Sequence, residues 1–305
     1  MNPLRLMGHM GLLLLASLPL QAAELWSREN LFAWCIVPFD ARHRDSEQRA
    51  QMLDGLKLRA LAYDWRAEHI PAFDTEVETM KRHGIDVMAW WFPTTLNNDA
   101  RNILAVCKRH GIAPQLWVMG GGEPVKSPEE QAARVEREAE RLRPIAQAAA
   151  EIGSKVALYN HGAWFGEPEN QLAIIARLER EGVKNVGMVF NFHHAHDSLP
   201  RFAELWPKMM PHLLAVNLNG MERDGEKSGR KILYLSEGDQ ELGMMRLIAA
   251  SGWRGPVGII DHRPDTDSDE TLRNNLRGLD WLVAELRAPG SGGPRPTFAT
   301  TRLAP

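Results

Sequence analysis

Short apolar runs alternate with longer segments of helical periodicity along the chain. Eight of these runs are continuously apolar, which is typical of strands that are buried on both faces. Each is followed by a segment in which apolar residues recur every three to four positions, the spacing of an amphipathic helix. The predicted strands are 33–39, 58–63, 85–92, 113–119, 155–160, 186–190, 213–218 and 257–260.

The helical segments carry recognisable boundary residues. Ser46 is placed to cap the first helix, and glycine follows five of the later helices. Glycine is favoured at that position because it readily adopts the left-handed backbone conformation that ends many helices. The predicted helices are 46–56, 74–83, 98–110, 128–152, 168–181, 200–209, 240–251 and 269–286.

Eight strand–helix units predict an α/β fold, a closed (β/α)8 TIM barrel in a single domain. A doubly wound open sheet is the alternative, but it usually has fewer units and often carries a glycine-rich phosphate turn. The glycine cluster at 120–122 is followed by Glu-Pro and lacks the G-x-x-G spacing of a dinucleotide fingerprint. We therefore expect no nucleotide cofactor.

The two ends of the chain depart from this pattern. Residues 1–23 combine Arg5, a short apolar run over 11–20 and the small residues Ala22 and Ala23, which is the plan of a secretory signal peptide. The run is shorter than the roughly 20 apolar residues of a membrane span. The sequence thus predicts a signal peptide (1–23), a barrel (24–287) and a disordered tail (288–305) rich in Gly, Pro, Ser and Thr. We expect a secreted or periplasmic protein without membrane attachment after signal cleavage.

Composition narrows the class of partner. The 305 residues are 44% hydrophobic and 25% charged, which is ordinary for one large globular domain. A net charge of -3 and a pI near 6.4 give no sign of a nucleic-acid or membrane-surface partner. Export permits a disulfide, but we expect Cys35 and Cys107 to be free thiols, since buried free cysteine is a common core residue.

Polar and aromatic side chains gather at the predicted strand ends. Because the active site of a (β/α)8 barrel forms at the C-terminal ends of its strands, these residues are expected to share one pocket. Asn and Asp bind hydroxyl groups and Trp rings cover the apolar face of a sugar, so the set predicts a small-molecule carbohydrate ligand. The candidate substrate-binding residues are Asp64, Arg66, Trp90, Gln115, Tyr159, Asn160, Asn191, Asn217, Asn219 and Arg263.

Three titratable residues at strand ends are the candidates for catalysis. His161 and His194 are able to bind a metal or move protons, and Asp261 is the best-placed single carboxylate for acid–base work. The alternatives are that the histidines are neutral hydrogen-bonding groups that support loops, and that Asp261 caps the segment after it. Asp64 and Arg66 form either a substrate clamp or an internal ion pair.

Six strand-end motifs carry a resemblance to a known family. They are AWCIVPFD (33–40), YDWR (63–66), YNHG (159–162), NFHH (191–194), NLNG (217–220) and GIIDHR (258–263). With these motifs the chain resembles the xylose-isomerase-like TIM barrels, which include sugar isomerases, sugar epimerases and the endonuclease IV group. The resemblance covers roughly 31–286, and within the family the chain looks like a secreted bacterial branch often described only as sugar phosphate isomerase/epimerase.

The resemblance implies a divalent metal held by Glu on strand five, Asp on strand six, His on strand seven and Glu on strand eight. In this chain those four positions hold Tyr159, Asn191, Asn217 and Asp261. Neutral side chains bind a hard divalent ion far more weakly than charged ones do. The chain therefore departs from the metal-dependent pattern of its relatives.

Two histidines still match the resembled pattern. His161 and His194 stand where the family has the histidines of its strand-five and strand-six motifs. Together with Asp261 they are the candidate ligands of a rebuilt site for Mn, Mg or Zn, provided that all three converge on one point.

Two functions follow as hypotheses. One is an exported enzyme of isomerase, epimerase or lyase type, which moves a proton next to a carbonyl of a sugar or oxidised sugar. Asp261 with His161 or His194 would be its base and acid, and Arg66 or Arg263 would offset developing negative charge. The other is a non-catalytic carbohydrate-binding barrel derived from a sugar isomerase. Nucleic-acid repair is opposed by the charge and by the missing zinc ligands.

Overall fold

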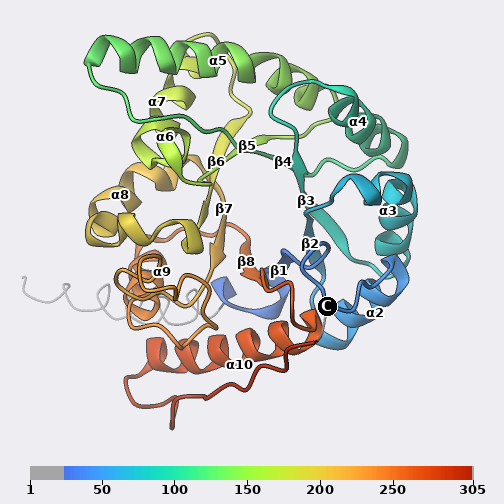
Figure 1. The fold of residues 1–305 in the computed structure, drawn as a ribbon, viewed down its shortest axis with the longest axis vertical. Coiled ribbons are helices and arrows are strands. Elements are labelled where there is room, and N and C mark those ends of the chain that lie inside the picture. Colours follow the sequence, from blue (N-terminus) through green and yellow to red (C-terminus); the bar gives the residue numbers. More distant parts are fainter. Residues whose placement is uncertain (1–23, 304–305) are drawn as a thin grey trace, which may run out of the picture.

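Eight parallel strands close into a barrel in sequence order (Figure 1). The computed structural model describes residues 24–303 of the chain. Pairing of the first strand with the last, from Leu31 with Val257 to Trp34 with Ile260, closes the cylinder and rules out an open sheet. The strands are β1 (Leu31–Trp34), β2 (Ala60–Tyr63), β3 (Asp86–Phe92), β4 (Gln115–Val118), β5 (Val156–Tyr159), β6 (Val186–Asn191), β7 (Leu213–Leu218) and β8 (Val257–Ile260).

Helices follow the strands and form an outer ring around the barrel (Figure 1). The α-helices are α2 (Ser46–Leu56), α3 (Phe73–Arg82), α4 (Asn98–His110), α5 (Pro128–Glu151), α6 (Ala163–Gly166), α7 (Pro168–Glu179), α8 (Phe202–Met209), α9 (Glu241–Ser251) and α10 (Ser268–Arg287). Short 3-10 turns are η1 (Arg28–Asn30), η2 (Ala67–Ala72), η3 (Phe192–His194), η4 (His196–Arg201) and η5 (Met210–His212). None of the described helices combines the length and apolar character needed to cross a bilayer.

The start of α2 differs in detail from the prediction. Asp45, not Ser46, caps the helix, because its carboxylate accepts a hydrogen bond from the Gln48 amide at 2.8 Å. Ser46 instead donates to Glu76 of α3 at 2.6 Å. Glu76 also forms a fully buried ion pair with Arg49, whose Nε lies 2.9 Å from the carboxylate. These contacts fix α2 against α3.

The interior of the barrel is filled by a few large rings among small side chains. Trp34 of β1 meets Trp117 of β4 edge to face at 4.7 Å between ring centroids. The neighbouring inward positions are small, which leaves room for the rings: Ala62, Ala89, Ala157 and Ala215. This packed layer closes the barrel interior below the C-terminal ends of the strands.

The segment after α10 makes defined contacts, which differs from the disorder that its composition predicts. Phe298 lies 5.1 Å from the ring of Tyr234, and the Thr300 hydroxyl is 2.9 Å from the Tyr234 hydroxyl. Arg295 donates to the carbonyls of Ser236 and Gly238. Scattered aromatic and arginine anchors provide these contacts, whereas the average composition of the segment is polar and glycine-rich. The predicted signal peptide (1–23) lies outside the described residues.

Candidate functional site

A narrow cavity of about 50 Å³ opens at the C-terminal ends of the strands. Its wall comes from the C-terminal ends of β1, β3 and β5 and from the segments that follow β1, β2, β5, β6 and β8. It is far smaller than the roughly 300 Å³ at which ligand pockets begin, so it admits only the reacting end of a ligand. The lining residues are Trp34, Cys35, Phe39, Asp64, Arg66, Trp91, Tyr159, His161, His193, His194 and His262.

A buried phenol stands at the base of this cavity. The hydroxyl of Tyr159 accepts a hydrogen bond from Trp34 Nε1 at 3.1 Å and another from Asn191 Nδ2. Because both partners are donors, the hydroxyl keeps its own proton available for a third group. Burial raises the pKa of Tyr159 well above its usual value, so the phenol stays protonated. Tyr159 is thus a neutral hydrogen-bond donor facing the site.

The one carboxylate among the lining residues belongs to Asp64. Its Oδ1 accepts a hydrogen bond from the Val37 amide at 3.3 Å, while Oδ2 has no partner among residues 24–303. Burial raises the pKa of Asp64 to about 7, against the opposing pull of the nearby Arg66 charge. No ion pair joins the two side chains in the described part of the protein. Asp64 is therefore poised to exchange a proton near neutral pH.

Local backbone geometry explains how Val37 reaches Asp64. The sequence predicts a strand over 33–39, but β1 ends at Trp34 because Cys35 adopts a left-handed conformation with φ 59°. The chain therefore turns across the mouth of the barrel. Cys35 and Cys107 are both free and buried, as expected, and burial raises the pKa of the Cys35 thiol, which remains uncharged.

Four imidazole rings form one side of the cavity. Ring centroids are 4.4 Å apart for His161 and His194, 3.6 Å for His193 and His194, and 4.9 Å for His193 and His262. Burial and the neighbouring rings lower the pKa of His194 to about 2, and burial lowers the pKa values of the other three. The cluster is neutral at physiological pH, so each ring has one N–H that is able to donate a hydrogen bond and one nitrogen that is able to accept one.

The sequence profile of the xylose isomerase-like TIM barrels matches residues 64–284. The chain belongs to this family. No curated protein sequence matches it. Similar solved structures include 3-keto-D-glucoside 4-epimerase from E. coli, at 15% identity and a TM-score of 0.59 over 83% of this chain and 98% of that one.

Two further structures of the same architecture are similar. D-psicose 3-epimerase, solved in the presence of D-fructose, has 12% identity and a TM-score of 0.58 over 85% of this chain and 99% of that one. The IOLI protein, solved with a zinc atom, has 14% identity and a TM-score of 0.60 over 84% and 98%. These likenesses establish the fold that this family member shares with them.

The three proposed metal ligands do not converge in this family member. Ile260 points into the barrel, so the next residue, Asp261, points outward toward the start of α10. There it is fully buried and accepts a hydrogen bond from Ser268 Oγ at 2.5 Å, and burial raises its pKa well above the usual range. Within residues 24–303, no three His, Cys, Asp or Glu side chains are placed to share a metal ion. The donor set therefore does not fit the metal ion that the resemblance implies.

Alternation along the strands also removes two predicted binding residues from the site. Trp91 faces the cavity, so Trp90 faces the helices, where it packs edge to face on Tyr63 and Phe73 at 5.0 and 5.1 Å. Gln115 lies at the start of β4, at the opposite end of the barrel, and donates to the Leu214 carbonyl at 3.1 Å. Trp91 therefore takes the place in the cavity that the sequence predicts for Trp90.

The predicted asparagines mostly bind the scaffold. Asn160 exchanges two hydrogen bonds with the backbone of Asn191, at 2.8 and 3.0 Å, and so ties β5 to β6. Asn219 bonds to the carbonyls of Gly220 and Lys231, both at 2.8 Å, and holds the loop after β7. Asn217 is fully buried, and neither atom of its amide has a partner among the described residues. Asn160 and Asn219 therefore support the site, and none of these three residues lines the cavity.

Arg263 likewise lies outside the cavity. Its guanidinium sits 3.8 Å from the ring centroid of Tyr234, and Nη2 donates to the Ile232 carbonyl at 3.1 Å. It therefore stabilises the loop after β7. Of the predicted set, Asp64, Arg66, Tyr159, His161 and His194 line the cavity.

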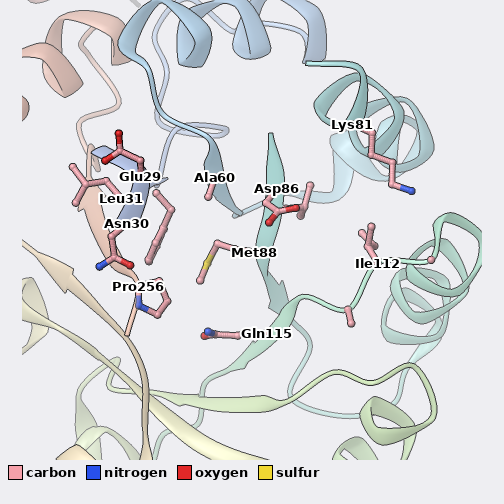
Figure 2. Close-up of a pocket in the computed structure, with 14 residues that line it drawn as sticks. Glu29, Asn30, Leu31, Ala60, Lys81, Asp86, Met88, Ile112, Gln115 and Pro256 are labelled. Carbon is pink, nitrogen blue, oxygen red and sulfur yellow. The ribbon is translucent and has the colours of Figure 1, made fainter. Parts of the chain in front are cut away.

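A second, larger cavity of about 680 Å³ opens at the N-terminal end of the barrel. Figure 2 shows its lining residues, with Met88 and Gln115 between Asn30 on one side and Asp86 on the other. In this fold the N-terminal face contributes to stability, while chemistry is placed at the opposite face. The group with a pKa near neutrality, Asp64, also lies at that opposite face, so we assign the chemistry to the smaller cavity.

Proposed function

We propose that this protein is an enzyme of the sugar isomerase or epimerase type, which moves a proton at a carbon next to a carbonyl. The observation that carries the proposal is the pair formed by Asp64 and Tyr159. A carboxyl with a pKa of about 7 and a phenol with a free proton line the same cavity at the catalytic end of the barrel. The substrate class, a sugar or oxidised sugar, is supported by the structural similarity to sugar epimerases.

The first step uses both groups at once. The carbonyl oxygen of the ligand accepts a hydrogen bond from the Tyr159 hydroxyl, and the Asp64 carboxylate removes a proton from the adjacent carbon. The electron pair of the broken C–H bond moves toward the carbonyl oxygen and gives an enediolate. Trp34 and Asn191, which donate to the phenol oxygen, make the phenol a stronger donor as negative charge grows.

The second step returns the proton. The carboxyl group of Asp64 delivers it to a carbon of the enediolate, and the carboxylate is regenerated with no net change in charge. Delivery to the former carbonyl carbon gives an isomer: the hydroxyl proton passes from the oxygen of the adjacent carbon to the former carbonyl oxygen, so the carbonyl moves by one position. The neutral imidazoles of His161 and His194 bind hydroxyl groups, and the ring of Trp91 covers an apolar face of the sugar.

Proton exchange in heavy water tests this proposal. The full chain is incubated with D-fructose, D-glucose, D-xylose and 3-keto-D-glucose, and deuterium entry next to the carbonyl is followed by NMR. We expect exchange with at least one sugar for the wild-type protein and none for Asp64→Asn. Exchange that persists in the variant contradicts the role of Asp64.

The alternative is a carbohydrate-binding barrel without activity. It is favoured by the neutral residues Tyr159, Asn191 and Asn217 at positions where the resembled enzymes carry metal ligands. Sugar binding by calorimetry, with no deuterium exchange in any of the four sugars, would favour this function over the enzyme.

We also propose that the protein is exported. The support is the pattern of Arg5, the apolar run over 11–20 and the small residues at Ala22 and Ala23. N-terminal sequencing of the protein recovered from a bacterial periplasm tests it. A chain that begins near residue 23 or 24 is expected, and an intact N-terminus in the cytoplasm contradicts it.

A further inference from the structure

Arg66 is a cation at the mouth of the cavity that has no carboxylate partner among the residues that the structure describes. It follows β2 and lines the cavity together with Asp64. Its Nη1 donates to the carbonyls of Asp64 and Trp65, both at 2.8 Å, and its guanidinium lies 5.6 Å from the ring centroid of Phe39. Other arginines, such as Arg44 and Arg49, pair with acids. Within residues 24–303 Arg66 forms no ion pair.

The contacts of Arg66 leave one edge of the guanidinium unused. Both hydrogen bonds to the backbone come from Nη1, and neither Nε nor Nη2 bonds to any described residue. Nε and Nη2 form the side-on edge that matches the two oxygens of a carboxylate. The ring of Phe39 and the two carbonyls hold the group in place, so little side-chain freedom is lost when an anion binds.

The charges around the cavity favour an anion. Asp64 is the acidic residue in the lining, and its pKa of about 7 leaves it partly protonated. The four imidazoles are neutral. Lys231 adds positive charge from the loop after β7 and helps to lower the pKa of His194, although its ammonium already pairs with Glu226 at 2.6 Å. Among the residues that line the cavity, Arg66 is thus the cation available to a ligand.

From this geometry we infer that the substrate is a sugar acid whose carboxylate binds the free edge of Arg66. The inference rests on the proposed function, since it places the reacting carbon of the same ligand at Asp64. Arg66 and Asp64 are two positions apart in an extended segment and therefore project to the same side. The carboxylate would lie at the rim while the carbonyl enters the narrow cavity beside Tyr159.

Calorimetric titration of the full chain compares matched ligands. D-glucuronate and D-galacturonate differ from D-glucose and D-galactose by one carboxylate. At neutral pH and low salt we expect the acids to bind at least about tenfold more tightly, with the advantage shrinking as salt is added. Deuterium exchange next to the carbonyl, measured with the same four ligands, reports separately on the proposed function.

Two variants test whether Arg66 causes the preference for sugar acids. Arg66→Gln should reduce the affinity for the acids to that for the neutral sugars. Arg137→Gln, at an exposed arginine on α5, is the matched control and should change neither. Circular dichroism verifies the fold of both variants. The ratio of the affinities for acids and neutral sugars in the wild-type protein tests the inference even if a variant does not fold.

Each outcome has a definite meaning. Equal affinity for acids and neutral sugars, or tighter binding of D-glucose 6-phosphate than of D-glucuronate, overturns the sugar-acid inference, while deuterium exchange in a neutral sugar would leave the proposed function standing. An acid preference that survives Arg66→Gln also overturns the inference. If no ligand binds and none exchanges, both the inference and the proposed function fail.

Discussion

The side-chain amide of Asn191 donates a hydrogen bond to the hydroxyl of Tyr159. By the family resemblance, these two positions would hold an aspartate and a glutamate that share a metal ion. In this protein the neutral amide of Asn191 donates to the neutral hydroxyl of Tyr159. Trp34 Nε1 donates to the same hydroxyl at 3.1 Å. The site therefore offers a polarised O–H group where the resemblance implies a metal ion.

Removing this O–H group should slow the reaction. We expect Tyr159→Phe to lower kcat by roughly 10²–10³-fold, the typical cost of losing one donor to a developing oxyanion. The change also leaves Trp34 Nε1 and Asn191 Nδ2 unpaired, at about 1–3 kcal/mol each. Steady-state kinetics and chemical unfolding measure the two effects separately.

Tyr234→Phe is the matched control for this variant. Its hydroxyl lies 2.9 Å from the Thr300 hydroxyl, outside the cavity. It should lose about 1 kcal/mol of stability or less and keep its kcat. An equal loss of kcat in both variants would contradict a specific role for Tyr159.

Activity should depend on the ionisation of Asp64. The base must be ionised, and its pKa is raised to about 7 by burial, so kcat/KM should fall about tenfold per pH unit below that value and level off above it. A pH–rate profile measures this. An inflection near the usual carboxylate range, about pH 4, would mean that another group limits the reaction.

The same raised pKa should appear in stability. The folded-state pKa of about 7 lies above the unfolded value of about 3.9, so ionised Asp64 destabilises the fold. Its effect is absent below about pH 4 and grows as pH rises toward 7. Asp64→Asn should flatten the pH dependence of the unfolding free energy over that range. Parallel curves for wild type and variant would show that the folded pKa is not raised.

Substitution of Asp261 distinguishes a metal-free site from a metal site. Because burial keeps its carboxyl protonated and Ser268 donates to it, Asp261→Asn should preserve the hydrogen bond and change activity by less than about fivefold. Treatment with a chelator should leave activity unchanged as well. Loss of activity in both experiments, with recovery on adding Mn or Zn, would support the hypothesis that His161, His194 and Asp261 bind a metal ion.

The buried ion pair between α2 and α3 should dominate local stability. Arg49→Met leaves the Glu76 carboxylate buried with only the Ser46 hydroxyl as partner, and we expect a loss of about 3–5 kcal/mol. Replacing the exposed pair of Lys227 and Asp224 should cost less than about 1 kcal/mol. Urea unfolding of the two variants tests the contrast.

The fold was predictable because each apolar run is short and each is followed by a helix with clear ends. The bounds of α4, β7 and β8 agree with the prediction at both ends. The early end of β1 was not predictable, since the left-handed backbone at Cys35 carries no glycine as a signal. The contacts of the tail depend on Phe298 and Arg295, whose partners lie far away in sequence.

The position of the site in the barrel was predictable, but not which residues line it. β3 and β8 are apolar on both faces, so no polar marker shows which residues point inward. The sequence pattern therefore predicts Trp90 and Asp261 in the pocket. In the structure, Trp91 points into the cavity and Asp261 points toward α10. The raised pKa of Asp64 arises from burial, which depends on the assembled barrel and not on the YDWR motif itself.

The C-terminal segment runs beside α10 and reaches the loop that follows β7 (Figure 1). Phe298 and Arg263 both pack on Tyr234, so the last residues and the end of β8 share one anchor. Shortening the gene to stop after α10, or fusing a purification tag close to Thr300, would loosen that anchor. Expression vectors for this protein should keep the segment up to Thr300 and place any tag away from it.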